Sequence, residues 1–186
     1  MSTTIQTQLL TAEEFYALPN PLDGARQELV RGKVVNVAGP GVEHGEVQGQ
    51  IHFLLKTFLN QNKLGRVMVE SATVIERKPD TVRGPDVSYY SKERLPLDKR
   101  VVGYHTEVPD LCVEVVSPSN SNKQLKAKAK EYLFAGVRLV WIIDPEDRTA
   151  TVIIDPLESR TLEADATLDG GDVLPGFACK VSDLFA

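Results

Sequence analysis

The feature that most constrains the fold is a short apolar run over residues 111–116, with the sequence LCVEVV. Pro109-Asp110 precedes this run and Ser117-Pro118-Ser119 follows it. Turn-forming residues on both sides of such a run are typical of an interior β-strand. A buried, unpaired charge is costly, so an acid inside such a strand is usually paired, protonated or bound to a metal. Glu114 is therefore a candidate functional residue. The alternative is a strand with one solvated face, on which Glu114 reaches water.

Composition predicts an ordinary soluble globular protein of one domain. The 186 residues are 42% hydrophobic and 25% charged, and we expect a single domain over residues 1–186 with an N-terminal helical arm over 1–24. The chain has no apolar stretch of the roughly 18 residues that a membrane span needs, and its start does not resemble a signal peptide. We therefore expect no membrane association and a cytoplasmic location. Cys112 and Cys179 lie far apart in the sequence and are expected to be reduced packing residues.

The formal net charge of −5 argues against binding nucleic acid through the whole surface. A local basic patch stays open, because lysine and arginine cluster in several segments that folding could bring into one groove. The alternative is that these side chains are ordinary solvated charges. The segments are 77–78, 83, 92–94, 99–100 and 123–130.

Hydrophobic periodicity predicts an alternation of strands and helices. A strand at Glu114, a helix and a strand at Trp141 follow one another, which indicates a right-handed crossover between parallel strands. We therefore expect an α/β fold with a mixed β-sheet flanked by α-helices. The predicted elements are a short helix from Thr11, a hairpin over 28–38, a helix over 43–60, strands over 66–76 and 87–90, a helix from Ser121 to Ala135, and a hairpin formed by 138–143 and 149–154.

One lysine of the helix predicted after Glu114 falls on its apolar side. At 100° per residue, Lys128 shares a face with Leu125, Ala129, Tyr132 and Leu133, whereas the other lysines project elsewhere. Either its stem runs along the core and its ammonium reaches solvent, or the side chain points at the carboxylates of the sheet.

Asp86, Glu114 and Lys128 form a set of two acids and an amine around the predicted sheet. Two neighbouring carboxylates repel each other unless a cation lies between them, and hard oxygen ligands suit Mg²⁺ or Mn²⁺. A nearby lysine can hold a phosphate, orient water or, with a lowered pKa, act as a base. The combination favours metal-assisted hydrolysis of a phosphodiester bond.

These segments resemble the Uma2 family, which is assigned to the PD-(D/E)XK restriction-endonuclease-like superfamily. The resemblance covers nearly the whole chain. It is carried mainly by Pro85-Asp86, by residues 111–118 and by residues 128–145, with further similarity at 28–35, at His44 and at Leu184-Phe185. It implies a restriction-endonuclease-like core.

Carried over by position, the resemblance implies metal ligation by Asp86, Glu114 and the backbone carbonyl of Val115, with Lys128 as the catalytic lysine. Glu28 would complete the acidic cluster, unless it is an exposed strand acid. His44 would assist near the site, although a lone histidine at a helix start is more often structural. The sequence departs from the superfamily pattern in one respect, because Val116 occupies the position two residues after the second acid where lysine is usual.

Two functions follow as hypotheses. The first is a DNA endonuclease dependent on Mg²⁺ (or Mn²⁺), acting as a homodimer so that two sites address two strands. The second is a non-catalytic binding or regulatory module that retains the nuclease fold, since fold resemblance does not establish activity.

Overall fold

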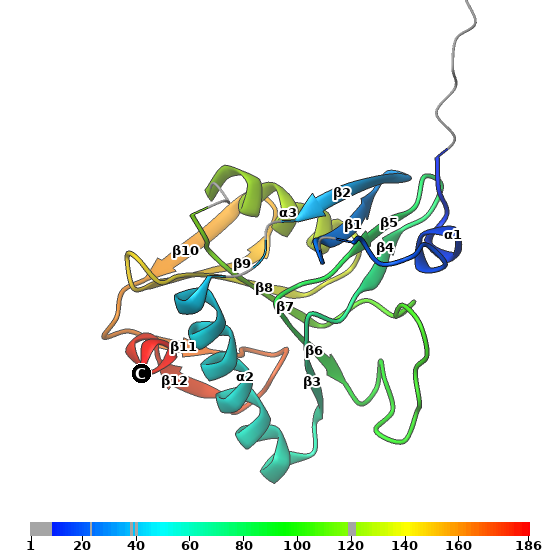
Figure 1. The fold of residues 1–186 in the computed structure, drawn as a ribbon. Coiled ribbons are helices and arrows are strands. Elements are labelled where there is room, and N and C mark those ends of the chain that lie inside the picture. The colour runs from blue at the N-terminus through cyan, green and yellow to red at the C-terminus, as the bar shows by residue number, and fades with distance from the viewer. Residues whose placement is uncertain (1–8, 23, 38, 40, 119–121) are drawn as a thin grey trace, which may run out of the picture.

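The computed structural model describes residues 9–22, 24–37, 39, 41–118 and 122–186. Its described strands form three sheets (Figure 1). The largest has six strands in the order β10-β9-β8-β7-β6-β3, and it is mixed, because β7 and β8 are parallel and the other neighbours are antiparallel. Its strands are β3 (Gly65–Val69), β6 (Val87–Ser91), β7 (Leu111–Val115), β8 (Leu139–Asp144), β9 (Thr149–Asp155) and β10 (Glu158–Leu162).

The central strand β7 is buried along its whole length because helices cover both faces of the sheet. Helix α2 (Val42–Asn62) packs on one face, where Leu111, Val113 and Val115 project. Helix α3 (Asn122–Phe134) packs on the other face against Cys112. Figure 1 shows the two helices on opposite sides of β7 and β8. The expected α/β fold with a mixed, helix-flanked sheet is therefore confirmed.

A second sheet carries the N-terminal part of the chain. Its four strands lie in the order β2-β1-β5-β4, all antiparallel. The strands are β1 (Arg26–Val30), β2 (Lys33–Val37), β4 (Thr73–Glu76) and β5 (Thr81–Arg83). The predicted hairpin over 28–38 is formed by β1 and β2 and turns at Arg31-Gly32, where both residues have positive φ angles. Helix α1 (Ala12–Tyr16) packs on this sheet through Phe15, which contacts a small core around Leu29 and Val82.

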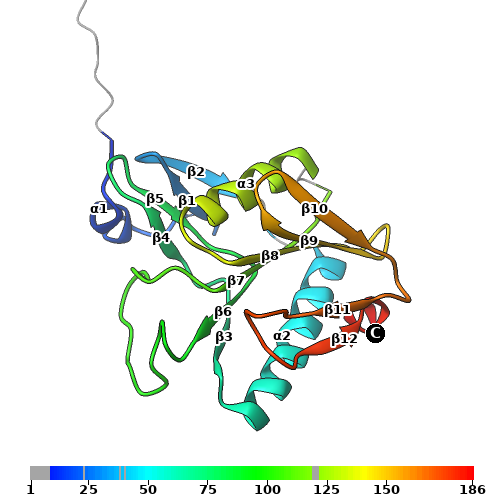
Figure 2. The same ribbon diagram turned by 180° about the vertical axis from the view of Figure 1, so that it is seen from behind.

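The C-terminal segment closes the core on the side of α2. Strands β11 (Thr167–Asp169) and β12 (Ala178–Lys180) form an antiparallel pair, and the 3₁₀-helix η1 (Val181–Phe185) follows. Figure 2 shows this segment beside α2. Leu168, Phe177 and Leu184 join the same core as α2. None of the described helices is both long and apolar enough to cross a membrane.

Several predicted elements need correction. The single strand expected over 66–76 is two strands, β3 and β4, which belong to different sheets, because the chain leaves one sheet after Val69 and enters the other at Thr73. The short strand β5 and everything after residue 154 were not predicted. The predicted start of α3 at Ser121 and residues 1–8 of the predicted arm lie outside the described residues. Both cysteines are free, as expected, and Cys112 is buried.

Asp80 attaches helix α1 to the four-stranded sheet. Its carboxylate accepts hydrogen bonds from the backbone N–H of Ala12 (2.8 Å) and of Lys78 (3.1 Å) and pairs with Arg77 at 2.8 Å. Burial acts to raise the pKa of Asp80, but these donors more than offset it and hold the pKa below its usual value. The charged form of Asp80 is therefore the stabilising one.

We predict that Asp80→Asn lowers the free energy of unfolding at pH 7 by about 1–3 kcal/mol, because buried donors lose a charged acceptor. Because the folded-state pKa is lowered, this stabilisation is present above about pH 4, the pKa of an unfolded aspartate, and is lost as the pH falls through the folded pKa. Urea unfolding of both proteins between pH 7 and pH 2 measures the difference. The exposed Asp98→Asn is the control, and a difference that persists unchanged at pH 2 would contradict the assignment.

Candidate functional site

Asp86 and Glu114 are brought together by strand register. The antiparallel pair β6–β7 aligns Val87 with Val113, so the next residues outward, Asp86 and Glu114, stand opposite each other. Side chains directly opposite in an antiparallel pair project to the same face, about 5 Å apart at Cβ. Both acids are buried. The alternative of a solvated strand face at Glu114 is therefore wrong.

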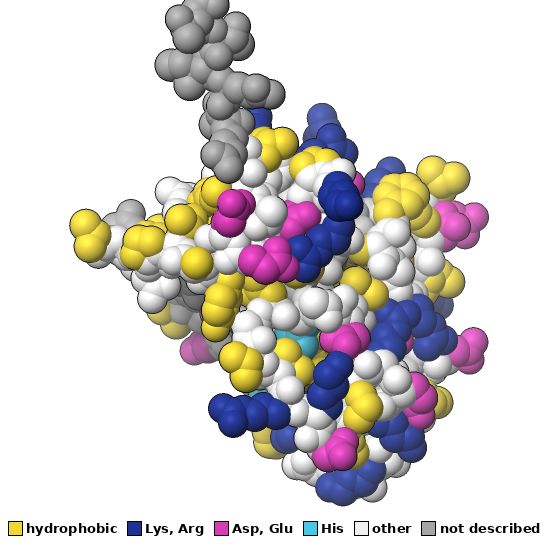
Figure 3. Space-filling model, turned by 90° about the vertical axis from the view of Figure 1, so that its right-hand side faces the viewer, with side chains coloured by type: hydrophobic (Ala, Val, Ile, Leu, Met, Phe, Trp, Pro, Cys, Tyr) yellow, Lys and Arg dark blue, Asp and Glu magenta, His cyan; other side chains and the backbone are white. Residues whose placement is uncertain are grey.

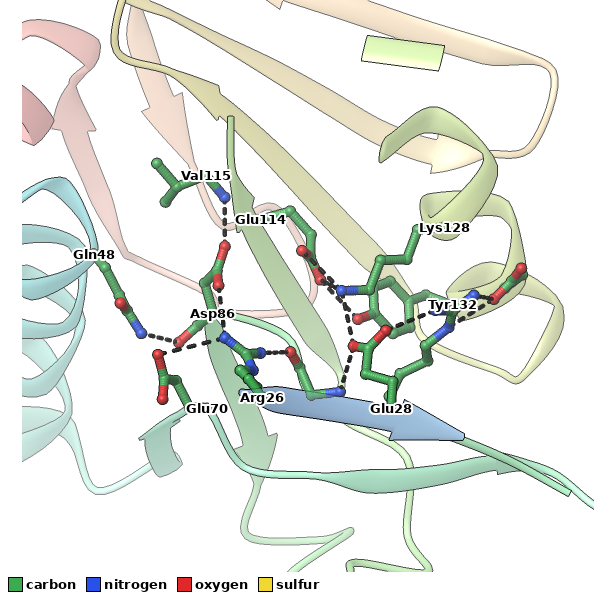
Figure 4. A network of polar contacts seen from close by, with 12 residues as sticks. Arg26, Glu28, Gln48, Glu70, Asp86, Glu114, Val115, Lys128 and Tyr132 are labelled. Carbon is green, nitrogen blue, oxygen red and sulfur yellow. Dashed lines mark hydrogen bonds and ion pairs between the residues drawn. The ribbon is translucent and has the colours of Figure 1, made fainter. Parts of the chain in front are cut away.

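Glu114 is held by two side chains of helix α3. The ammonium of Lys128 lies 2.9 Å from Oε1 and 3.1 Å from Oε2 of Glu114, and the hydroxyl of Tyr132 donates a hydrogen bond to Oε1 at 2.7 Å. Lys128 and Tyr132 are four residues apart, so they share one helix face. Lys128 therefore points at the carboxylate, which is one of the two orientations predicted for it (Figure 4).

Glu28 reaches the same lysine from the other sheet. Its Oε1 lies 3.1 Å from Nζ of Lys128 and accepts a hydrogen bond from the N–H of Gly84 at 3.0 Å, while its Oε2 pairs with Arg83 at 2.6 Å. Arg83 also pairs with Glu131 of α3 at 2.7 Å. Glu28 is thus a buried member of the acidic cluster and not an exposed strand acid.

Asp86 is held by one backbone N–H and by the side chains around it. Its Oδ2 accepts the N–H of Val115 at 2.8 Å, and its own carbonyl accepts a hydrogen bond from Gln48 of α2 at 2.9 Å. Nη1 of Arg26 lies 3.6 Å from Oδ1. The contact of Val115 with Asp86 uses the N–H of Val115, and metal ligation by its carbonyl stays a prediction.

His44 lies in the first turn of α2 and is buried. Its Nε2 is 3.4 Å from Oδ1 of Asp86. Neither ring nitrogen has a hydrogen-bond partner that meets the usual geometry within the part of the chain that the structure describes. The structure therefore places His44 beside the acidic cluster, where the resemblance implied it.

The charges of the cluster act strongly on one another. Burial raises the pKa of Glu114, and the neighbouring Asp86 and Glu28 add to the shift, against the opposing effects of Lys128 and Tyr132. Burial also acts to raise the pKa of Glu28, but Lys128 and Arg83 more than offset it and lower that pKa.

The ammonium of Lys128 is stabilised in its charged form. Burial acts to lower the pKa of Lys128, but the surrounding carboxylates outweigh burial, so the pKa is raised. The surrounding carboxylates therefore favour the charged form of Lys128. Of the roles considered for it, holding a phosphate or orienting water fits this state.

A cavity of about 560 Å³ opens onto the cluster. The face of β1 that carries Arg26, Glu28 and Val30 forms one wall, and α3 forms another with Lys128 and Glu131. Asp86, Glu114 and His44 also line it. The cavity therefore lies between the two sheets and α3.

The chemistry of the donor set is compatible with a divalent cation. Five carboxylates, of Glu28, Glu70, Asp86, Glu114 and Glu131, share three cationic side chains, of Arg26, Arg83 and Lys128. Hydrogen bonds of Gly84 with Arg26 and Glu28 join the two groups of ion pairs into one network. With every acid ionised, the network carries a residual charge of −2. Within the described ranges, no three His, Cys, Asp or Glu side chains are placed to hold a metal together. A site of two carboxylates, Asp86 and Glu114, suits Mg²⁺, which usually keeps several waters and binds substrate phosphate.

The basic segments do not form one groove. Arg83 belongs to the acidic cluster, whereas Arg94 pairs with Asp110 at 2.9 Å and Lys99 pairs with Glu107 at 2.6 Å in the loop after β6. On the face shown in Figure 3, lysine and arginine side chains alternate with aspartate and glutamate. The interpretation as ordinary surface charges holds for Lys99 with Glu107, whereas Arg94 pairs with the buried Asp110.

Three side chains of the cluster, of Tyr132, Arg26 and Arg83, were not predicted to lie at the site. Tyr132 was assigned only to the core, although its spacing of four from Lys128 was a usable signal. Arg26 and Glu28 alternate on one strand, which predicts a shared face. Arg83 had no comparable signal, because β5 is only three residues long and its partners lie 48 and 55 residues away in sequence.

Comparison with known proteins agrees with this fold. The sequence model of the Uma2 family, described as "putative restriction endonuclease", matches residues 12–182. A crystal structure of a "putative nuclease belonging to DUF820" from Anabaena variabilis ATCC 29413 superimposes with a TM-score of 0.82 at 22% sequence identity. The match covers 95% of this chain and 97% of the other. Curated proteins yield no match.

The pairing of Lys128 predicts unequal effects of removing each partner. Lys128→Met leaves Glu114 buried without its cation, so we expect a loss of about 3–5 kcal/mol in the free energy of unfolding at pH 7. Glu114→Gln removes a disfavoured charge, while Lys128 keeps Glu28, so its stability should equal or exceed that of the wild type. The double variant should recover part of the loss.

Urea unfolding of the four proteins without added metal measures this cycle. Lys130→Met, on the exposed face of the same helix, is the matched control and should change stability by about 0.5 kcal/mol or less. Equal free energies of unfolding for Lys128→Met and the wild type would show that the ion pair of Lys128 with Glu114 does not stabilise the fold.

Proposed function

From the membership of this chain in the Uma2 family and from its buried acid–lysine cluster, we propose that the protein is a metal-dependent endonuclease that hydrolyses DNA phosphodiester bonds. The observation that carries the proposal is the convergence of Asp86, Glu114 and Lys128 at one cavity. In this proposal Mg²⁺, or Mn²⁺ in its place, is held by Asp86, Glu114 and the carbonyl of Val115. A bound divalent cation polarises a phosphoryl oxygen and provides hydroxide at neutral pH.

The side chains of the protein have separate tasks in this proposal. Lys128 stays protonated and stabilises the negative charge that develops on the phosphoryl oxygens, because its pKa is raised by the carboxylates around it. Tyr132 and Glu28 are positioning residues, since they hold Glu114 and Lys128 in place. The N–H of Val115 orients Asp86. The protein acts as a homodimer, the commonest symmetric assembly.

One observation favours the second hypothesis, a non-catalytic module with the same fold. Each of the cationic side chains at the cavity already contacts at least one carboxylate: Arg26 contacts Glu70 and Asp86, Arg83 contacts Glu28 and Glu131, and Lys128 contacts Glu28 and Glu114. Substrate phosphate must compete with these contacts. Cleavage and metal binding separate the two hypotheses.

We predict that the purified protein cleaves DNA in Mg²⁺ or Mn²⁺ and that Asp86→Asn, Glu114→Gln and Lys128→Ala each reduce the rate by about a hundredfold or more. Supercoiled, linear and heat-denatured DNA are the substrates, so that any cleavable form is detected. Lys130→Ala, a lysine on the same helix that does not line the cavity, should retain the wild-type rate. Retained activity in all three site variants would locate the reaction elsewhere.

Metal binding gives a readout that does not depend on turnover. We predict that Mn²⁺ or Mg²⁺ at about 100 times its dissociation constant stabilises the wild type by about 2.7 kcal/mol and so raises its melting temperature. Asp86→Asn should abolish this rise, because it removes an anionic ligand. Melting curves with and without EDTA test this. A metal-dependent rise in melting temperature without DNA cleavage would support the non-catalytic module. If the metal changes neither the melting temperature nor the DNA, the proposed metal site is wrong.

A further inference from the structure

The acids of the cluster lie at the bottom of the cavity and not on an open surface. Glu28 and Asp86 are each 4% exposed, Glu114 is 3% exposed, and the side chain of Lys128 is 13% exposed. Helix α3 and the β1–β2 hairpin form the walls. A phosphodiester group must therefore enter the cavity to reach these side chains.

The size of the cavity limits what can enter. Its volume of about 560 Å³ lies within the range of pockets that hold one small-molecule ligand. A B-form duplex is much larger, since its major groove alone is about 12 Å wide. The cavity therefore has room for a group the size of one nucleotide, whereas a whole duplex is too wide to enter it.

One wall of the cavity is apolar. Val30, Val35 and Val37 of the hairpin line it, and Val35 is 43% exposed although it is a valine. The register of β1 and β2 places Val35 opposite Glu28 and Val37 opposite Arg26. An apolar surface therefore lies next to the charged residues, as suits a ligand with an apolar face joined to an anionic group.

The cationic side chains at the cavity are suited to one phosphate group and not to a long phosphate backbone. Arg83 and Lys128 each bridge two carboxylates, and Arg26 lies between Glu70 and Asp86. Proteins that bind duplex DNA through its backbone use many lysine and arginine contacts, each of which neutralises a phosphate. Lys123, Lys126 and Lys130 are exposed and do not line this cavity.

We infer that the cavity accepts a single unpaired nucleotide, so that the substrate is single-stranded DNA or a frayed or overhanging strand and not intact duplex. The phosphate meets Lys128 and the acidic cluster, and the base and sugar pack on Val35 and Val37. This inference rests on the proposed function and specifies its substrate. An enzyme that acts on a nucleotide inside such a pocket must unstack that nucleotide, and the cost is least for a strand that is already single.

The test compares short DNA oligonucleotides of one sequence as a single strand, as a duplex with a single-stranded overhang and as a blunt duplex with G·C-rich ends. Cleavage is measured with wild-type protein in Mn²⁺ under single-turnover conditions. Binding of the same fluorescent oligonucleotides is measured by anisotropy with Glu114→Gln. We expect cleavage of the single strand to be about a hundredfold faster than that of the blunt duplex, with cuts confined to the overhang in the mixed substrate.

Val35→Trp narrows the apolar wall and should lower single-strand cleavage and affinity by about tenfold or more. Val34→Trp is the matched control, because Val34 lies on the same strand, pairs with Leu29 and does not line the cavity. Both valines are partly exposed on a hairpin, so both variants should fold, which melting curves verify.

The outcomes distinguish a failure of the substrate inference from a failure of the nuclease proposal. A single-strand preference in binding without any cleavage would support the inference and overturn the nuclease proposal. Cleavage and binding of the blunt duplex as good as those of the single strand would overturn the inference and leave the nuclease proposal standing. Equal effects of Val34→Trp and Val35→Trp would also overturn it, because the cavity wall would then have no specific role.

Discussion

The ammonium of Lys128 is the interaction on which the site depends. It lies 3.1 Å from Glu28 of the four-stranded sheet and 2.9 Å from Glu114 of the six-stranded sheet, and its own backbone belongs to α3. One charge therefore joins three elements that are distant in sequence. Without it, two buried carboxylates would face each other across the junction of the sheets, and a buried charge without a partner is strongly destabilising.

Local pattern was enough to predict the centre of the fold and part of the site. The apolar run 111–116 predicted an interior strand, and helical periodicity separated Lys128 from the lysines around it. The partners of these residues were beyond that reasoning, because contacts between Arg83 and Glu131 or between Glu28 and Lys128 depend on how two sheets meet. For the same reason a continuous β-rich stretch from Arg66 to Glu76 was assigned to one strand, although a break of three residues sends it into two sheets.

Val116 stands where the pattern implied by the resemblance has a lysine, and in the structure Lys128 of α3 contacts the acids instead. Val116 is partly buried and packs against the hydrophobic cluster between α3 and the six-stranded sheet. Glu114 projects from the sheet on this same side, toward α3. The lysine reaches the acids from the helix that covers this face. The cationic group is thus supplied by a different element, and its position depends on the packing of α3 through Leu125, Ala129 and Tyr132. An altered motif in the strand is therefore compatible with a complete set of charges at the site.

The β1–β2 hairpin is joined to the rest of its sheet by the pairing of Leu29 with Val82 between β1 and β5. Its turn is also held, by hydrogen bonds from the N–H of Arg31 to Thr81 and from the N–H of Gly32 to the carbonyl of Asp80. Its other attachments near the cavity are the ion pairs of Glu28 and the contacts of Arg26 with Glu70 and Asp86. Local opening beside the cavity therefore requires those charges to separate, in addition to the loss of the packing of Leu29. An anion that draws Lys128 and Arg83 away from Glu28 weakens this attachment, so occupancy of the cavity and mobility of its wall are thermodynamically linked.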